Sequence, residues 1–181
     1  MIKLTLPLSY DEAQSLRAGD SALLSGHVYT ARDAAHKRLI RLLDENKPLP
    51  VDLQGETIYY VGPAPARPGN AVGPAGPTTS SRMDAYTPRL LALGLRAMIG
   101  KGARSEAVIQ AMREHGAVYF GATGGAAALI AKSIVKSEVV CYPDLGAEAI
   151  HRFEIWNFPA IVLIDARGGN LYVLGPAKYK E

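Results

Sequence analysis

The chain has 181 residues, 48% of them hydrophobic, so it is long enough to bury the core of one domain. Its 20 Lys and Arg residues and 17 Asp and Glu residues are interspersed, and no basic stripe with interleaved aromatic residues indicates nucleic-acid binding. It contains neither a long apolar run nor a signal-peptide core. We therefore expect a cytoplasmic protein that has no membrane segment.

Strand and helix patterns alternate along the first half of the chain. Hydrophobic alternation predicts strands at residues 3–6 and 22–30, with a short helix at 11–16 between them. An amphipathic helix begins at Asp33 and ends before Pro48, and residues 57–61 form a further strand pattern. Residues 62–77 are rich in Gly and Pro, which excludes regular structure. Long irregular loops in compact domains are usually functional, so we expect an active-site loop here, with a plain linker as the alternative.

The second half continues the alternation. Strands are predicted at 95–99, 117–120 and 139–142, and helices at 83–93, at 105–114 and over a segment that ends near residue 134. Ser105 and Gly116 are the expected caps of the middle helix, and Pro88 must kink or restart the first. A short helical turn is predicted at 145–150, and residues 160–164 and 171–174 read as a final hairpin. The pattern predicts one α/β domain over residues 1–181, with a mixed sheet flanked by helices.

Cys141 is the only cysteine, which excludes an internal disulfide framework. One thiol cannot by itself hold an iron–sulfur cluster or a structural zinc ion. Because Cys141 lies in an apolar strand pattern, we expect a small residue of the buried core and no metal site in this chain.

An anion site is predicted where Gly76-Pro77 runs into four hydroxyl residues, Thr78 to Ser81, followed by Arg82. This run precedes a helical pattern, so we expect it at a helix N-terminus, whose free N–H groups and dipole favour negative charge. The guanidinium of Arg82 adds a planar fork that suits a carboxylate. Simple helix capping by the hydroxyl groups is the alternative.

Two more cations, Arg32 and Lys101, also follow predicted strands. Loops beyond the carboxyl ends of strands converge in open α/β sheets, so Arg32, Arg82 and Lys101 can face one small dianion. Solvated surface charges are the alternative. The sequence has no G-x-S-x-G elbow, no phosphate-binding P-loop and no G-x-G-x-x-G fingerprint, so no complete catalytic motif accompanies these residues.

Six segments together carry a family resemblance: Thr30-Ala-Arg-Asp-Ala-Ala-His-Lys37, Tyr59-Tyr-Val-Gly-Pro63, Gly76-Pro-Thr-Thr-Ser-Ser-Arg-Met-Asp84, Ile99-Gly-Lys-Gly102, Gly124-Gly-Ala-Ala-Ala128 and Asp144-Leu-Gly-Ala-Glu-Ala149. Over about residues 2–175 the chain resembles the β subunit, or C-terminal domain, of class I fumarate hydratases and L-tartrate dehydratases. The resemblance implies a swivelling β/β/α-type domain that closes over a [4Fe-4S] cluster carried by a separate α subunit. It implies that an open iron of that cluster acts as a Lewis acid on the substrate hydroxyl.

The resemblance also implies roles for individual residues. The substrate contacts carried over are Arg32, Thr78, Thr79, Arg82 and Lys101, and Thr78 resembles the proposed catalytic base. A neutral threonine is a poor base, so it would need a carboxylate from the α subunit.

The function expected from the resemblance is reversible hydration of fumarate to (S)-malate by a complex with a fumarase α subunit. Without the α subunit the chain would be inactive or nearly so. We expect it to form a hetero-oligomer, or a homodimer when it is isolated. An L(+)-tartrate dehydratase β subunit is the close alternative, because both substrates are C4 2-hydroxy dicarboxylates. A stand-alone dicarboxylate-binding module and a purely structural subunit also fit the sequence.

Overall fold

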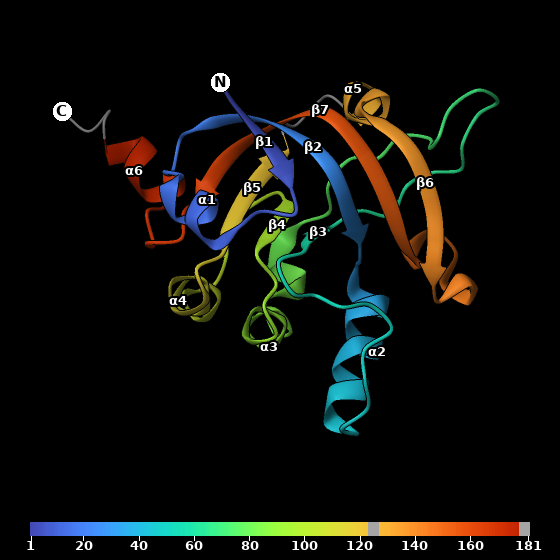
Figure 1. Ribbon diagram of the computed structural model, residues 1–181, viewed down its shortest axis with the longest axis horizontal. Coiled ribbons are helices and arrows are strands. Elements are labelled where there is room, and N and C mark those ends of the chain that lie inside the picture. Colours follow the sequence, from blue (N-terminus) through green and yellow to red (C-terminus); the bar gives the residue numbers. More distant parts are fainter. Residues whose placement is uncertain (123–126, 178–181) are drawn as a thin grey trace.

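The computed structural model describes residues 1–122 and 127–177, which form a mixed α/β fold (Figure 1). The elements in chain order are β1 (Ile2–Leu6), α1 (Tyr10–Ser15), β2 (Ser21–Thr30), α2 (Asp33–Asp44), β3 (Thr57–Tyr59), the 3₁₀ helix η1 (Ser80–Met83), α3 (Thr87–Ala92), β4 (Ala97–Gly100), α4 (Glu106–His115), β5 (Val118–Ala122), α5 (Ala127–Ser133), β6 (Ile134–Cys141), the 3₁₀ helix η2 (Pro143–Glu148), β7 (Ile150–Ile164) and α6 (Leu171–Ala177).

The seven strands form one mixed sheet in the order β1-β2-β3-β4-β5-β7-β6, and an additional β2–β7 pairing closes it. Strands β2, β3, β4 and β5 are parallel neighbours, whereas β7 runs antiparallel to β2, β5 and β6. β1 pairs with residues 22–26 of β2, and β3 pairs with Tyr29 and Thr30 farther along the same strand. The result is a closed five-stranded barrel of β2, β3, β4, β5 and β7. Because β2, β3 and β4 are parallel, their carboxyl ends meet at one end of this barrel.

Two apolar clusters hold the fold together. One fills the barrel, where Tyr59, Phe120, Phe153 and Phe158 are completely buried. The other lies between the sheet and the helices α2, α3 and α4, which cover the same side of it (Figure 1). The α/β class with a mixed, helix-flanked sheet is thereby confirmed, and no helix within the described residues is long and apolar enough to cross a membrane.

The predicted C-terminal hairpin is wrong, because residues 171–177 form helix α6. The Asp165 carboxylate accepts hydrogen bonds from the N–H groups of Ala18, Arg167 and Gly169, which fixes the turn after β7. The Asn170 side chain then accepts from the N–H of Tyr172 at the start of the helix, as an N-cap residue does. Local polar contacts therefore override the β-propensity of the Leu171–Leu174 run.

Other boundaries also differ from the sequence prediction. β7 begins at Ile150, ten residues before the predicted strand, and Pro88 restarts the 83–93 segment as a separate helix, α3, after η1. Cys141 is half-buried at the end of the mostly exposed strand β6, so its placement in a buried core strand was wrong. The small-residue segment at 124–126 lies outside the described residues.

Candidate functional site

The Thr78–Ser80 segment crosses the carboxyl ends of β3 and β4. The Thr78 N–H donates to the carbonyl of Tyr60 at 2.7 Å, and the Ser80 N–H donates to the carbonyl of Lys101 at 2.9 Å. Thr79 and Lys101 form a parallel β-bridge, so the backbone itself brings both threonines next to Lys101. The side chains of Thr79 and Lys101 are exposed beyond the strand ends.

This arrangement differs from the predicted anion site at an α-helix N-terminus. Thr79 precedes a four-residue 3₁₀ helix, and its side chain makes no capping hydrogen bond. Thr79 does stand at the N-cap of η1, but the N–H groups of Thr78 and Ser80 are bonded to the strand ends and are not the free donors expected from the sequence. The exposed hydroxyl of Thr79 and the exposed ammonium of Lys101 are available to a ligand here.

The buried Ser80 side chain holds this segment in place. It is fully buried, its Oγ accepts from the Lys101 N–H at 3.1 Å, and it is hydrogen-bonded to the Tyr119 hydroxyl at 2.8 Å. Gly100 is required beneath it, because a Cβ at that position would lie 2.0 Å from Ser80 Oγ. Gly100 therefore leaves room for the Ser80 hydroxyl, which any larger residue at this position would displace.

Arg32 lies directly beyond the carboxyl end of β2. The N–H of the preceding Ala31 donates to the carbonyl of Tyr59 at 3.2 Å, which keeps this end of β2 beside β3. Its guanidinium lies over Gly62, where a Cβ would be 2.9 Å from Nη1. The Nε atom is 3.3 Å from Glu148 Oε1 but is not aligned for a hydrogen bond, so this contact is a loose ion pair.

Arg82 joins the group through the start of α2. Its Nε donates to Asp33 Oδ1 at 3.0 Å, and its side chain is about half exposed. Asp33 is the residue after Arg32, so this contact links η1 to the end of β2. The structure thus places Arg32, Arg82 and the Thr79–Lys101 pair at the same end of the barrel.

A buried ion pair below the site was not anticipated from the sequence. Arg104 Nε donates to Asp84 Oδ1 at 2.7 Å, and Arg104 Nη2 donates to Thr87 Oγ1 at 2.9 Å. The guanidinium lies 5.2 Å from the ring centre of Tyr60 and 4.9 Å from that of Tyr119, within the range of cation–π attraction. One hint of this ion pair is present in the sequence, namely that Asp84 stands at the end of the hydroxyl-rich segment that carries the family resemblance.

His36 is buried directly behind Arg32. Its Nδ1 lies 2.8 Å from the Arg32 carbonyl, and its ring packs against those of Tyr60 and Tyr86. Burial lowers the pKa of His36 to about 4, so the imidazole is neutral at pH 7 and donates from Nδ1–H to the carbonyl. From the sequence we expect an ordinary helix-face histidine; instead it fixes the backbone that carries Arg32.

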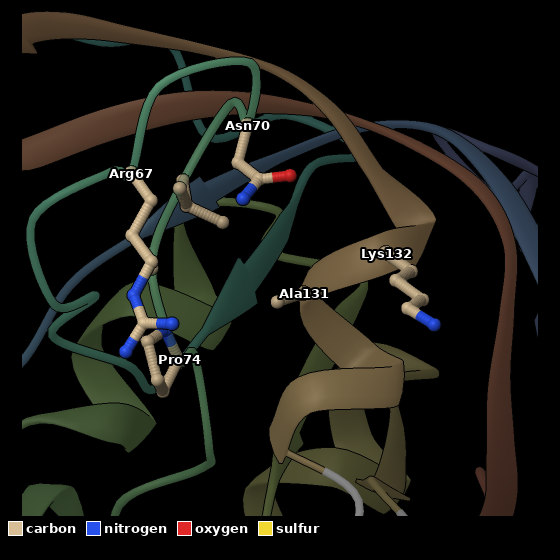
Figure 2. A pocket seen from close by; sticks show the side chains of 7 residues that line it. Arg67, Asn70, Pro74, Ala131 and Lys132 are labelled. Atoms are coloured by element: carbon tan, nitrogen blue, oxygen red, sulfur yellow. The ribbon is translucent and has the colours of Figure 1, made fainter.

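The Pro/Gly-rich segment of residues 62–77 has no regular structure, as predicted, but it is anchored at its base. The N–H of Ala64 donates to the carbonyl of Pro74, and the N–H of Gly73 donates to the carbonyl of Ala64, both at 3.0 Å. Val72 and Ala75 are buried, whereas residues 65–70 are exposed. A cavity of about 350 Å³ lies between this loop and α5, and in Figure 2 Arg67 lies on the loop side of it and Lys132 on the side of α5.

Comparison with known proteins decides the family. Residues 1–175 match the family model described as Fumarase C-terminus. The chain belongs to the fumarase C-terminus family. It is 42% identical to the class I aerobic fumarate hydratase of Escherichia coli K12 over 151 residues, which cover 82% of this chain and 28% of that protein. It is 39% identical to fumarate hydratase 2 of Leishmania major over 157 residues, 85% of this chain and 28% of that protein.

A relative of similar length comes from Methanocaldococcus jannaschii. The protein named putative L(+)-tartrate dehydratase subunit beta is 36% identical over 171 residues, which cover 91% of this chain and 88% of that protein. This fumarase C-terminus chain therefore spans about a quarter to a third of the curated fumarate hydratases that it matches, but 88% of the protein named as a putative β subunit. The family resemblance seen in the sequence is confirmed.

The described residues do not fit the ligand set of an iron–sulfur cluster. Within residues 1–122 and 127–177, no three His, Cys, Asp or Glu side chains are grouped to hold a metal ion. Cys141 stands apart at the end of β6, and burial raises the pKa of its thiol, which disfavours the thiolate that such clusters require. The described residues of this chain therefore do not supply the ligands of a cluster.

Proposed function

We propose that this chain is the β subunit of a cytoplasmic class I fumarate hydratase, which hydrates fumarate reversibly to (S)-malate. In this proposal a separate α subunit holds the [4Fe-4S] cluster, and this chain supplies the substrate-binding side chains. The observation that carries the proposal is the Thr79–Lys101 pairing at the carboxyl end of β4, with Arg32 beyond the end of β2 at the same end of the barrel. The proposal is supported by the match of this chain to the fumarase C-terminus family.

The positive side chains suit a C4 dianion. Arg32 and Arg82 offer planar forks for carboxylate oxygens, and Lys101 offers a point charge. Within the described residues no acidic group pairs with the Lys101 ammonium, whereas Arg32 and Arg82 contact Glu148 and Asp33. A substrate carboxylate would have to compete with those two acids, so we assign Lys101 the largest share of the binding free energy.

Thr78 is the proposed base for the proton on C3 of malate. A cation beside the neighbouring carboxylate stabilises the negative charge that develops when this proton leaves. Among the described residues no carboxylate is hydrogen-bonded to the Thr78 hydroxyl, and a neutral hydroxyl is a weak base. We therefore propose that a carboxylate of the α subunit activates Thr78 when the two subunits close on the substrate.

An L(+)-tartrate dehydratase β subunit is the second candidate. The observation that favours it is the 88% coverage of the Methanocaldococcus jannaschii relative, whose name specifies both that reaction and a separate subunit. The same observation supports the two-subunit arrangement for either substrate.

The test is reconstitution with the α subunit encoded in the same genome. We expect little turnover from the chain alone and fumarate hydration, followed by loss of its ultraviolet absorbance, when both proteins are mixed anaerobically. L(+)-tartrate is assayed in parallel, and the larger kcat/KM identifies the substrate. Full-rate hydration by the chain alone would contradict the proposal, as would tight binding of fumarate to the chain alone in calorimetry, which indicates a stand-alone binding module.

Lys101→Met tests the assignment of the site. Removing a cation that pairs with a carboxylate in a closed site should lower kcat/KM. The fall should correspond to a loss of about 2–5 kcal/mol in transition-state stabilisation. Lys37→Met is the matched control, because Lys37 is an exposed lysine on α2. Equal effects of the two substitutions would show that the Thr79–Lys101 pair is not the substrate site.

A further inference from the structure

Strand β6 leaves one edge of the sheet open. Within the described part of the chain it pairs with β7 alone, and Figure 1 shows it at the outer margin of the sheet. Its burial pattern is that of an exposed strand: Val135 is 59% and Val139 is 49% exposed. An open edge presents unpaired N–H and C=O groups, which template the addition of another strand. An added strand would also cover the exposed valines of β6.

The sequence of β6 is complementary to itself when it is read in the antiparallel direction. The strand is Ile-Val-Lys-Ser-Glu-Val-Val-Cys, with Ser137 near its centre. If two copies pair about a two-fold axis at Ser137, Lys136 of each copy lies opposite Glu138 of the other. Val135 then lies opposite Val139 in the same register. Opposite charges and paired apolar side chains at directly facing positions both stabilise antiparallel pairs.

Around Ser137, β6 pairs with β7 without irregularity. The β6–β7 register shifts between Ile134 and Lys136 and again between Val139 and Cys141, so residues 136–139 are the regularly paired segment. Both charged residues of the self-complementary motif lie in that segment. Lys136 Nζ is 4.0 Å from Glu154 Oε1, and Glu138 lies opposite Arg152. Across a two-fold axis these residues would continue as a row of alternating charges on one face of the sheet.

The opposite sheet edge lacks this property. β1 is Ile-Lys-Leu-Thr-Leu, and Lys3 is its only charged residue. Any antiparallel self-pairing of β1 places Lys3 opposite an uncharged residue or opposite another Lys3. An edge lysine of this kind discourages strand addition. Self-complementarity therefore distinguishes β6 from the other edge of the same sheet.

We propose that two copies of this chain associate through β6, forming a continuous antiparallel sheet centred on Ser137. The interface rests on residues 136–138 with Val135 and Val139 on either side of them, so it is smaller than the standard interface of about 1,600 Å². The dimer should accordingly dissociate on dilution. This association involves the outer edge of β6 and does not depend on the proposed function.

Charge reversal tests the pairing in the full chain by sedimentation velocity over a range of concentrations. Lys136→Glu and Glu138→Lys each turn two attractive pairs into two repulsive ones, because the axis repeats every contact. Each should weaken the wild-type dimer by roughly 10–100-fold. An equimolar mixture of the two variants should restore association as a heterodimer, and the double variant should restore the homodimer. Lys136 and its β7 partner are about half exposed, so we expect little loss of folding stability.

Lys3→Glu is the matched control, because it makes the same change of charge on the other edge strand and should leave the dimer unchanged. Circular dichroism verifies the fold of every variant. A wild-type chain that stays monomeric would overturn the proposal and leave the edge to another partner such as an α subunit. A dimer that tolerates both single reversals, or reversals that are not rescued by mixing, would equally overturn it.

Discussion

At the residue scale, the buried hydroxyl of Ser80 connects three parts of the site. It accepts a hydrogen bond from the Lys101 N–H and is bonded to the Tyr119 hydroxyl. In a Ser80→Ala variant the Lys101 N–H loses this acceptor, and the Tyr119 hydroxyl keeps only its hydrogen bond to the Gly102 carbonyl. Leaving a donor without its partner costs about 1–3 kcal/mol. We expect a loss of that size in the free energy of unfolding, measured by urea titration.

Ser81→Ala is the natural control for this change, since Ser81 is the exposed neighbour in the same 3₁₀ helix. A surface substitution of this kind should change stability by no more than about 0.5 kcal/mol. Indistinguishable midpoints for the two variants would mean that the Ser80 hydroxyl does not hold the site together.

His36 predicts a pH dependence of stability. Burial is the main cause of its low pKa of about 4, and the Arg104 charge acts in the same direction, against the Arg32 carbonyl and Asp33. Below pH 6.5 the unfolded chain takes up a proton at His36 that the folded chain refuses until about pH 4. Stability should therefore fall by roughly 2–3 kcal/mol as the pH is lowered from 6.5 to 4.

His36→Asn isolates this contribution, because the Asn amide can still donate to the Arg32 carbonyl but does not titrate. Urea unfolding at several pH values should give a flatter curve for the variant than for the wild type. Some slope should remain, because burial also lowers the pKa of His151. If the two curves run parallel between pH 6.5 and 4, His36 is not protonated on unfolding in the way that its burial indicates.

At the element scale, the Asp84–Arg104 pair ties η1 to the segment before α4. The Arg104 side chain is fully buried, and Asp84 also accepts from the Ser105 N–H at 2.6 Å. Removing one partner of a buried ion pair leaves an uncompensated charge, at a cost of about 3–5 kcal/mol. Asp84→Asn should lower the free energy of unfolding by that amount in denaturant titration.

The matched substitution is Asp44→Asn, which breaks the ion pair between Asp44 and Arg89 on the surface. Because both of those side chains are well exposed, its expected cost is below about 1 kcal/mol. Comparable losses in the two variants would show that water reaches the Asp84–Arg104 pair and screens it.

The elements that the sequence predicted well are those with local signals. Ser105 accepts from the Val108 N–H at the start of α4, and Gly116 adopts the left-handed conformation, φ 66°, that ends it. β7 was foreseen only from Ala160 onward, since His151, Arg152 and Glu154 interrupt its first half with polar side chains. Their alternation with Phe153 and Ile155 is a strand signal, but the sheet partners that make it decisive come from distant segments.

The site divides in the same way. The hydroxyl run and the cations were identifiable, because each combines a turn with side chains suited to carboxylates. Their arrangement was not, because it depends on hydrogen bonds from Thr78 to Tyr60 and from Ser80 to Lys101 between segments far apart in the sequence. Arg104 carried no local signal at all, since only tertiary packing places it between Tyr60 and Tyr119. The roles assigned to the five candidate residues stay predictions.

At the scale of the whole molecule, β7 joins the N-terminal half of the chain, which contains β1 to β3, to the C-terminal half, which contains β4 to β7. It pairs with β2 over eight positions, from Ser21 to Tyr29, and with β5 and β6 on its other side. The parallel pairing of β3 with β4 is a second contact between the two halves. The loop of residues 62–77 is thus a connection across an already closed barrel, and its own continuity is not needed to hold the halves together.

Limited proteolysis tests this consequence. A nonspecific protease should cut at the exposed residues 65–70, because the base of the loop is held by hydrogen bonds and by buried Val72. The two fragments should elute as one species in native gel filtration and separate only in denaturant, since every strand pairing survives the cut. Addition of the α subunit and fumarate should slow the cleavage if the loop closes on the site. Fragments that separate without denaturant would show that the β2–β7 pairing does not hold the barrel closed.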